Sequence, residues 1–134
     1  MMKTITSILA VLAVLLAFTP QDSQAQQLGD KVYWMVTTER PVGKLAEYHA
    51  FNEKELAPLM EKYGYKRVVT WQTIVGDIEE VIFVAEFENM AAYHKARRSL
   101  LGSEEWKTVS KKFDALIKST RSRFLSATPY SKMK

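Results

Sequence analysis

The sequence predicts an α+β fold in which a four-stranded antiparallel sheet carries helices on one of its faces. The first observation behind this prediction is the order of strand-like segments and segments with helical periodicity along the chain. The second is a Gly-Asp pair at residues 76–77, which suits a tight reversal between two neighbouring strands. The third is that the sequence has no repeat, low-complexity tract or composition shift that would mark a second folded domain.

Residues 1–25 have the composition of a secretory signal peptide. Lys3 precedes an apolar run from Ile5 to Phe18, and Ser23-Gln24-Ala25 supplies the small-residue cleavage pattern. The apolar run has about 14 residues, which is shorter than the ~20 needed to span a bilayer. We therefore expect cleavage after Ala25, one domain over residues 26–134, a periplasmic or secreted location, and no membrane association after cleavage.

The composition excludes several kinds of site. The chain has no cysteine, so disulfides, thiolate nucleophiles and cysteine metal ligands are ruled out. With only two histidines present, a zinc site built by the protein would need carboxylates as well, and we expect no metal site. We also expect no cofactor. The net charge is +4, and basic residues are densest between Lys107 and Arg123. Since the aromatic residues fall on core-facing positions, this indicates a solvated basic face and no nucleic-acid surface.

The first half of the domain predicts a strand followed by a helix. Residues 32–38 are rich in β-branched and aromatic side chains, and apolar residues fall on both faces of the strand, as in strands buried on both sides. Pro41 and Gly43 interrupt the chain, and a helix is then expected as far as Gly64, which ends it. Its apolar positions, which recur with helical period, are Leu45, Tyr48, Leu56, Leu59, Met60 and Tyr63.

The second half predicts a hairpin, two helices and a last strand. The hairpin strands cover residues 65–75 and 79–87. Asn89 is placed to cap a helix over residues 90–101, and Ser103 to cap the next one. The third helix has one apolar face, formed by Trp106, Val109, Phe113, Leu116 and Ile117. Residues 121–130 are expected to form the last strand, ended by Pro129.

This order of elements is the split β-α-β arrangement of ferredoxin-like folds. All the helices then cover one face of the sheet, although the first strand has apolar residues on both faces, with Tyr33 and Met35 alternating with Trp34 and Val36. A second sheet is the simplest cover for the other face. We therefore expect a homodimer in which two sheets pack face to face.

At this point the sequence resembles the NIPSNAP family, within the dimeric α/β barrel superfamily. The resemblance spans about residues 31 to 128 and implies a ferredoxin-like fold and a back-to-back dimer. Relatives in the superfamily include antibiotic-biosynthesis monooxygenases and haem-degrading oxygenases, whose active sites lie between the helices and the sheet of each subunit. The residues that carry the resemblance are Pro41 to Tyr48, Thr70-Trp71, Gly76-Asp77, Glu80-Val81, Arg97, Leu100-Leu101 and Glu105-Trp106.

The haem-degrading relatives need an asparagine on the first strand, a tryptophan on the third strand and a histidine on the second helix. His94 matches the histidine, but the first strand has no asparagine and the third strand has Phe83 in place of tryptophan. Haem oxygenation is therefore not expected.

Arg97 lies on an unexpected side of its helix. At about 100° per residue it falls within the apolar stripe of Met90, Tyr93, Leu100 and Leu101. An unpaired guanidinium in apolar surroundings is strongly unfavourable, so Arg97 needs a carboxylate, backbone carbonyls, water or a ligand anion as a partner. We expect either an anion-binding role or an ion pair with Glu86 or Glu55.

The same helical spacing places His49 and Asn52 on the inward stripe of the first helix, and His94 beside Arg97 on the second. Four polar groups would then face one sheet, as in a small-molecule pocket. In this hypothesis Arg97 and Asn52 bind an anionic or phenolic ligand, and His49 or His94 acts as general base. The competing interpretation has both histidines half-buried and bonded to water.

Tyr48 and Trp71 are the remaining candidates for ligand contact, although an aromatic residue on a strand also suits the core or a dimer interface. The functional hypothesis is an exported homodimer that binds a small organic ligand, with cofactor-independent oxygenation or isomerisation as the enzyme class by analogy. The alternative is a non-enzymatic structural or interaction protein with a closed interior.

Overall fold

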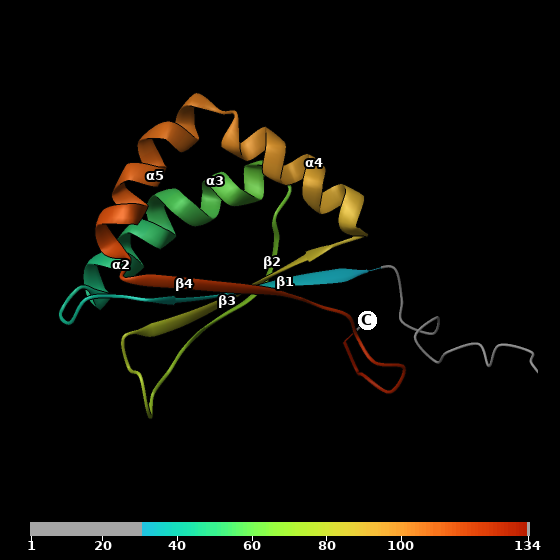
Figure 1. Cartoon of the computed structure of the whole chain (residues 1–134), viewed down its shortest axis with the longest axis horizontal. Coiled ribbons are helices and arrows are strands. Elements are labelled where there is room, and N and C mark those ends of the chain that lie inside the picture. The colour runs from blue at the N-terminus through green and yellow to red at the C-terminus, as the bar shows by residue number, and fades with distance from the viewer. Residues whose placement is uncertain (1–30, 134) are drawn as a thin grey trace, which may run out of the picture.

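The computed structural model describes residues 31–133 (Figure 1). The predicted signal peptide, residues 1–25, lies outside these residues. Between residues 31 and 133, none of the helices has the length and apolar character needed to cross a bilayer.

The sheet has four strands in the order β2-β3-β1-β4, and each neighbouring pair is antiparallel. This confirms the predicted α+β, ferredoxin-like arrangement. The strands are β1 (Val32–Glu39), β2 (Lys66–Gln72), β3 (Glu80–Phe87) and β4 (Ser119–Leu125).

Two strands have bounds that differ from the prediction by more than one residue. β2 ends at Gln72, because Thr73 closes the ladder with a backbone bond to Glu80 and the chain then leaves as a loop. The β-branched residues Ile74 and Val75, which extended the predicted strand, are exposed in this loop. β4 runs from Ser119, opposite Glu39, to Leu125, opposite Tyr33, whereas the predicted strand covered residues 121–130.

All helices lie on one face of the sheet, as Figure 1 shows. The first predicted helix is present as three segments, namely α2 (Leu45–Phe51), a π-helical turn η2 (Asn52–Leu56) and α3 (Ala57–Lys62). They are followed by α4 (Met90–Leu101) and α5 (Glu104–Leu116). Asn89 and Ser103 cap α4 and α5 as predicted, since their side chains accept the backbone N–H groups of Ala92 and Trp106.

The π-helical turn changes which residues of the first helix face inward. Phe51 and Leu56 are both buried although they are five positions apart in the sequence. This i to i+5 spacing suits a π turn and not an α-helix. The turn leaves Glu55 free to pair with Lys112 at 2.6 Å. Because the extra residue rotates everything before it by about 100°, Tyr48 faces the interior and His49 does not, contrary to the prediction for His49.

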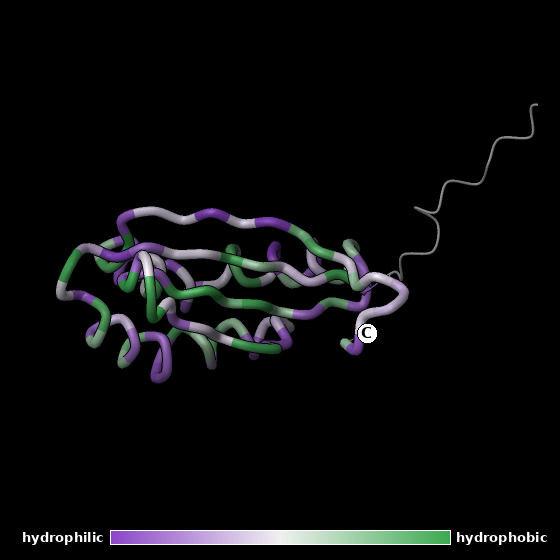
Figure 2. The backbone as a smooth tube through the Cα atoms, turned by 90° about the horizontal axis from the view of Figure 1, so that it is seen from below, coloured by the Kyte–Doolittle hydropathy of each residue, from purple (hydrophilic) through white to green (hydrophobic). Residues whose placement is uncertain are grey.

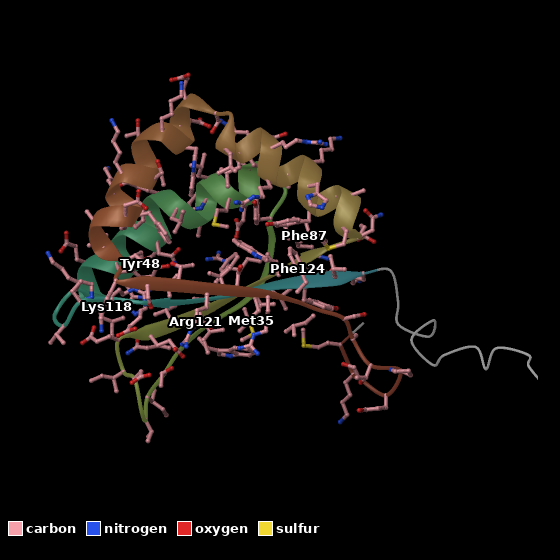
Figure 3. All side chains as sticks on the ribbon, in the orientation of Figure 1. Met35, Tyr48, Phe87, Lys118, Arg121 and Phe124 are labelled. Atoms are coloured by element: carbon pink, nitrogen blue, oxygen red, sulfur yellow. The ribbon has the colours of Figure 1, made fainter. Side chains whose placement is uncertain are left out.

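The core lies between the helices and the sheet. Tyr65 packs edge-on against Trp34, Phe87 and Tyr93, with ring centroids 5.2 to 6.5 Å apart. Figure 3 shows Tyr48, Phe87 and Phe124 on this side of the sheet, and Met35 and Arg121 on the other. Alternation along β1 therefore directs Trp34, Val36 and Thr38 toward the helices.

The opposite face of the sheet is not covered by helices. Figure 2 shows that the central strands β1 and β3 carry the hydrophobic stretches, while the edge strand β4 is largely hydrophilic. The strand register places an apolar set on this face, formed by Tyr33, Met35, Val69, Trp71, Ile82, Val84 and Leu125. We call this set the helix-free face.

Candidate functional site

A cavity of about 280 Å³ lies between the helices and the sheet. The first helix, α4 and α5 form its upper wall, and β1, β3 and β4 form its floor. The lining residues are Trp34, Val36, Thr38, Tyr48, Asn52, Leu56, Met60, Phe83, Arg97, Trp106, Phe113, Thr120 and Ser122. This is close to the lower end of the size range of small-molecule pockets, and it suits a ligand of one or two rings.

Arg97 is the one charged residue among the lining residues that the structure describes. Neither predicted ion pair forms, since Glu86 pairs with Lys31 and Lys66, and Glu55 pairs with Lys112. Between residues 31 and 133, Arg97 has no carboxylate partner. Arg97 is exposed, so its guanidinium reaches the cavity from the surface rather than lying in the core as predicted.

Tyr65 and Tyr93 show which end of the cavity Arg97 occupies. Burial raises the pKa of Tyr65 to about 12, and neighbouring Tyr93 also raises it, while the guanidinium of Arg97 acts in the opposite direction. Arg97 therefore lies near the Tyr65 hydroxyl. Tyr93, one turn before Arg97 on α4, packs on Trp34 at 6.0 Å, so Arg97 belongs to the end of the cavity that Trp34 lines.

Aromatic side chains form much of the cavity wall, namely Trp34, Tyr48, Phe83, Trp106 and Phe113. Aromatic walls of this kind favour a planar apolar body, which can stack or pack edge-on. Within residues 31–133, the side chains of Asn52, Thr120 and Ser122 also line the cavity and make no hydrogen bond. These groups are available to a ligand.

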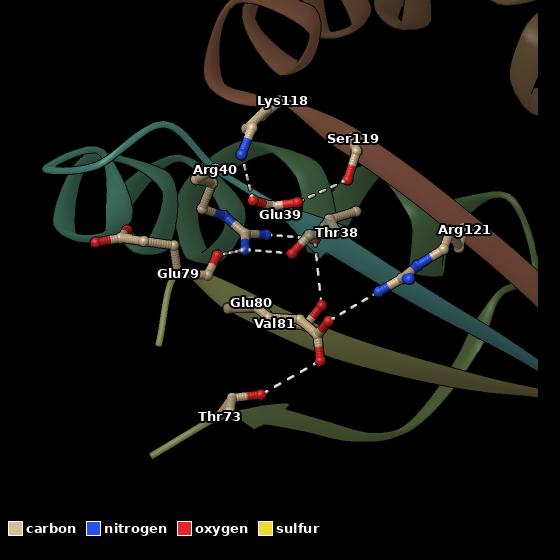
Figure 4. Close-up of polar contacts among 10 residues, drawn as sticks. All are labelled: Thr38, Glu39, Arg40, Thr73, Glu79, Glu80, Val81, Lys118, Ser119 and Arg121. Atoms are coloured by element: carbon tan, nitrogen blue, oxygen red, sulfur yellow. Dashed lines mark hydrogen bonds and ion pairs between the residues drawn. The ribbon is translucent and has the colours of Figure 1, made fainter. Parts of the chain in front are cut away.

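Arg40 lies behind two residues that line the cavity, Thr38 and Tyr48, and Figure 4 shows its contacts with Thr38 and Glu79. It is 1% exposed, and its guanidinium lies 3.5 Å from the ring centroid of Tyr48. It donates hydrogen bonds to the carbonyls of Thr38 and Glu79, at 2.8 and 3.0 Å, and to the Thr38 hydroxyl. Burial lowers the pKa of Arg40. The positions of Tyr48 and Thr38 therefore depend on a buried charge.

Three of the six residues proposed from sequence line the cavity, namely Tyr48, Asn52 and Arg97. His49 does not line it, because its imidazole is 3.0 Å from the side-chain oxygen of Gln72 at the sheet edge. His94 is exposed on α4 and packs beside Tyr93. Trp71 is on the helix-free face, 55% exposed, since it pairs in register with Ile82.

Sequence analysis missed Arg40, Thr120 and Ser122. The alternation that directs residues 34, 36 and 38 toward the helices also places Arg40 there, so a signal for Arg40 was present. Thr120 was missed because the last strand was predicted to begin at residue 121, whereas Ser122 lay within the predicted strand and was missed because its facing depends on the register with β1. A group of three or more potential metal-ligating side chains is not found within residues 31–133.

The NIPSNAP family profile matches residues 39–132. This chain belongs to the NIPSNAP family. The resemblance seen in the sequence is thereby confirmed. No curated protein sequence matches this NIPSNAP chain.

Solved structures similar to this NIPSNAP protein include a NIPSNAP family protein from Agrobacterium tumefaciens, with 18% identity and a TM-score of 0.74 over 78% of this chain and 99% of that chain. A NIPSNAP-like domain protein from Burkholderia xenovorans has 16% identity and a TM-score of 0.72, covering 76% and 89%. SnoaB, a cofactor-independent oxygenase from Streptomyces nogalater, has 12% identity and a TM-score of 0.58, covering 79% and 100%. At these identities the likeness concerns the fold.

Proposed function

We propose that this NIPSNAP protein binds a small organic anion with an apolar, planar body in the cavity between its helices and its sheet. The observation that carries the proposal is the position of Arg97, whose guanidinium lines an aromatic cavity without a carboxylate partner in residues 31–133. An anionic group would form a charge-assisted hydrogen bond there. The apolar walls would bury the rest of the ligand.

The alternative of a structural or interaction protein required a closed interior and an ion-paired Arg97. The cavity of about 280 Å³ beside Arg97 supports ligand binding over this alternative. Asn52 strengthens the support, because its amide lines the same cavity and its hydrogen-bonding groups are not used by residues 31–133.

Cofactor-independent oxygenation is the second candidate, and the fold likeness to SnoaB favours it. Arg97 would hold the substrate in its anionic, electron-rich form, which is the form that reacts with molecular oxygen. Within residues 31–133, no carboxylate or imidazole lines the cavity, so the general-base role predicted for His49 or His94 has no support from their positions. Proton transfer would fall to Tyr48 or to the substrate itself.

Two further parts of the proposal concern the setting of the site. We propose that the protein is exported to the periplasm or secreted, on the composition of residues 1–25. We also propose that it is a homodimer in which the apolar helix-free faces of two copies pack against each other, since a two-fold dimer uses the same surface of both subunits.

Isothermal titration with 2-naphthoate tests the binding proposal. This ligand has two fused rings and one carboxylate, and we expect it to bind the wild type. Arg97→Met should weaken binding by roughly 10- to 100-fold, the worth of one hydrogen bond to a charged group. Arg98→Met is the matched control, because Arg98 is exposed on the same helix and does not line the cavity. Equal affinities of both variants and the wild type would refute the role of Arg97.

Oxygen uptake tests the second candidate. Electron-rich phenols and enols that bind in the titration are incubated with the wild type and with Arg97→Met in an oxygen electrode. We expect uptake with the wild type that is lost with the variant. Binding without uptake for every such compound leaves the protein as a binding protein and excludes oxygenation of this class.

A further inference from the structure

We propose that the ligand is an elongated hydroxylated aryl carboxylate, held by Arg97 at its acidic end and by the hydroxyls of Thr120 and Ser122 at its phenolic end. This inference rests on the proposed function and adds the chemical class of the ligand and the residues that select it. It follows from the positions of the unpaired polar groups around the cavity.

Arg97 and Thr120 belong to different ends of the cavity, and Ser122 lies one inward-facing position nearer to Arg97 than Thr120 does. Arg97 is one turn of α4 beyond Tyr93, which packs on Trp34 at 6.0 Å, while Thr120 pairs in register with Thr38 and Ser122 pairs with Val36. Trp34 and Thr38 are four residues apart on β1, or about 13 Å at the rise of an extended strand. A two-ring ligand with a polar group at each end fits within this span.

The hydroxyls of β4 are free, and the neighbouring hydroxyl of Thr38 is not. Thr38 donates to the Val81 carbonyl at 3.3 Å and accepts a hydrogen bond from Arg40. Within residues 31–133, the side-chain hydroxyls of Thr120 and Ser122 make no hydrogen bond although both residues line the cavity. A hydroxyl both donates and accepts, so this pair fits a ligand hydroxyl.

The middle of the cavity is apolar and aromatic. Val36, Leu56 and Phe83 line the cavity and offer no hydrogen-bonding side chain, and the Ser122 hydroxyl, opposite Val36, lies at the β4 edge of this region. A ligand that reaches from Arg97 to the β4 hydroxyls therefore needs a planar apolar body with its polar groups at the periphery. An aryl carboxylate with a hydroxyl on the far side of its rings has this pattern.

The route into the cavity agrees with this orientation. Arg97, Thr120 and Ser122 are exposed, whereas Tyr48, Leu56 and Met60 are buried. The polar groups of the cavity therefore line its opening. A ligand with two polar ends keeps both of them at the rim while its rings fill the buried part.

The test compares two ligands that differ by one hydroxyl. 2-Naphthoate carries only the acidic group, while 6-hydroxy-2-naphthoate carries the acid and the hydroxyl at opposite ends of the rings. In isothermal titration of the wild type, we expect the hydroxylated ligand to bind roughly fivefold more tightly, the worth of one neutral hydrogen bond. The double variant Thr120→Val, Ser122→Ala should abolish this preference, so that the two ligands bind it with equal affinity.

Thr108→Val is the control, because Thr108 is exposed on α5 and does not line the cavity. It should keep the preference, and circular dichroism of every variant checks that the fold is intact. If both ligands bind equally to the wild type, or if the preference survives in the double variant, the inference is wrong and the proposed function stands. If neither ligand binds, the proposed function fails together with the inference.

Combining the variants tests the separation of the two ends. The triple variant combines Arg97→Met with Thr120→Val and Ser122→Ala. Because distant sites act independently, its fold-loss of affinity for 6-hydroxy-2-naphthoate should equal the fold-loss of Arg97→Met multiplied by that of the double variant. 2-Naphthol, which lacks the carboxylate, should respond to the β4 variants and not to Arg97→Met. Response of 2-naphthol to Arg97→Met alone would overturn the assigned orientation.

Discussion

At the scale of single residues, Arg40 is the buried charged residue within residues 31–133. Helical periodicity indicated that Arg97 points from α4 toward the sheet, and Arg97 lines the cavity there. Periodicity does not indicate how deeply a side chain is buried, and Arg97 is exposed. Arg97 is long enough to reach the surface, where water solvates it. Arg40 follows a strand and precedes Pro41, a context that resembles the start of a loop, so only its place in the strand alternation indicated that it points inward.

Arg40→Met should lower the free energy of unfolding by roughly 2–4 kcal/mol, because hydrogen bonds from a charged group are lost and buried carbonyls are left without donors. Methionine fills much of the volume and removes a buried charge, which offsets part of this loss. Urea unfolding followed by circular dichroism measures the change. Arg98→Met, on an exposed arginine, should change the stability by less than about 0.5 kcal/mol.

Arg40→Lys separates charge from shape. Lysine keeps the positive charge but cannot donate in the planar fork that reaches the carbonyls of Thr38 and Glu79 together. We expect a stability between those of the wild type and Arg40→Met. Wild-type stability in Arg40→Met would mean that the buried guanidinium is not needed to hold this part of the cavity wall.

At the scale of elements, the π-helical turn explains what the sequence could and could not predict about the site. Regular helical spacing aligns His49 with Leu56 and Met60, and it therefore placed the imidazole in the pocket. The π turn between them is set by tertiary packing, since it lets Phe51 and Leu56 both reach the core. Asn52 begins this turn and lines the cavity. Local sequence spacing cannot reveal such a change of helical register.

The N-cap of α5, by contrast, was predictable and can be tested by mutation. Ser103 accepts the N–H of Trp106 at 3.1 Å and donates to the carbonyl of Leu100 at 2.7 Å. Ser103→Ala should lower the free energy of unfolding by about 0.5–2 kcal/mol, because an N–H of the first turn loses its acceptor. Thermal unfolding followed by circular dichroism measures it.

Ser103→Thr should stay close to the wild type, since threonine also caps helices. Ser110→Ala is the control within α5, because Ser110 makes only a long bond of 3.4 Å to its own helix. If Ser103→Ala and Ser110→Ala have the same stability, the cap does not stabilise α5.

At the scale of the whole molecule, the sequence predicted the sheet, its helices and their common face, because each depends on apolar periodicity along one segment. Which side chains meet across the cavity depends on strand register, as with Thr38 opposite Thr120. Register follows from the end of α5 and from the bond between Lys118 and the Glu39 carbonyl, 2.8 Å long. That information is distributed over distant residues, so the sequence did not reveal the hydroxyls of β4.

The helix-free face leads to the last prediction, which concerns assembly. Trp71 is 55% exposed on this face, and the loop after β2 projects beyond the sheet on the side away from the helices, with Ile74 and Val75 exposed (Figure 1). Exposed apolar groups gathered in this way favour contact with a second copy. We expect the wild type to have twice the mass of the chain in sedimentation equilibrium, and Trp71→Glu to be monomeric because it would bury a carboxylate against the partner's apolar face.

Val42→Glu is the matched control, since Val42 is 90% exposed but lies in the loop between β1 and α2. It should remain dimeric. A monomeric wild type would rule out the homodimer. A dimer that survives Trp71→Glu would place the interface elsewhere, and the hydroxyls of the edge strand β4 would then need to be examined for contacts between copies. Retention of 2-naphthoate binding by monomeric Trp71→Glu would show that one subunit holds a complete cavity.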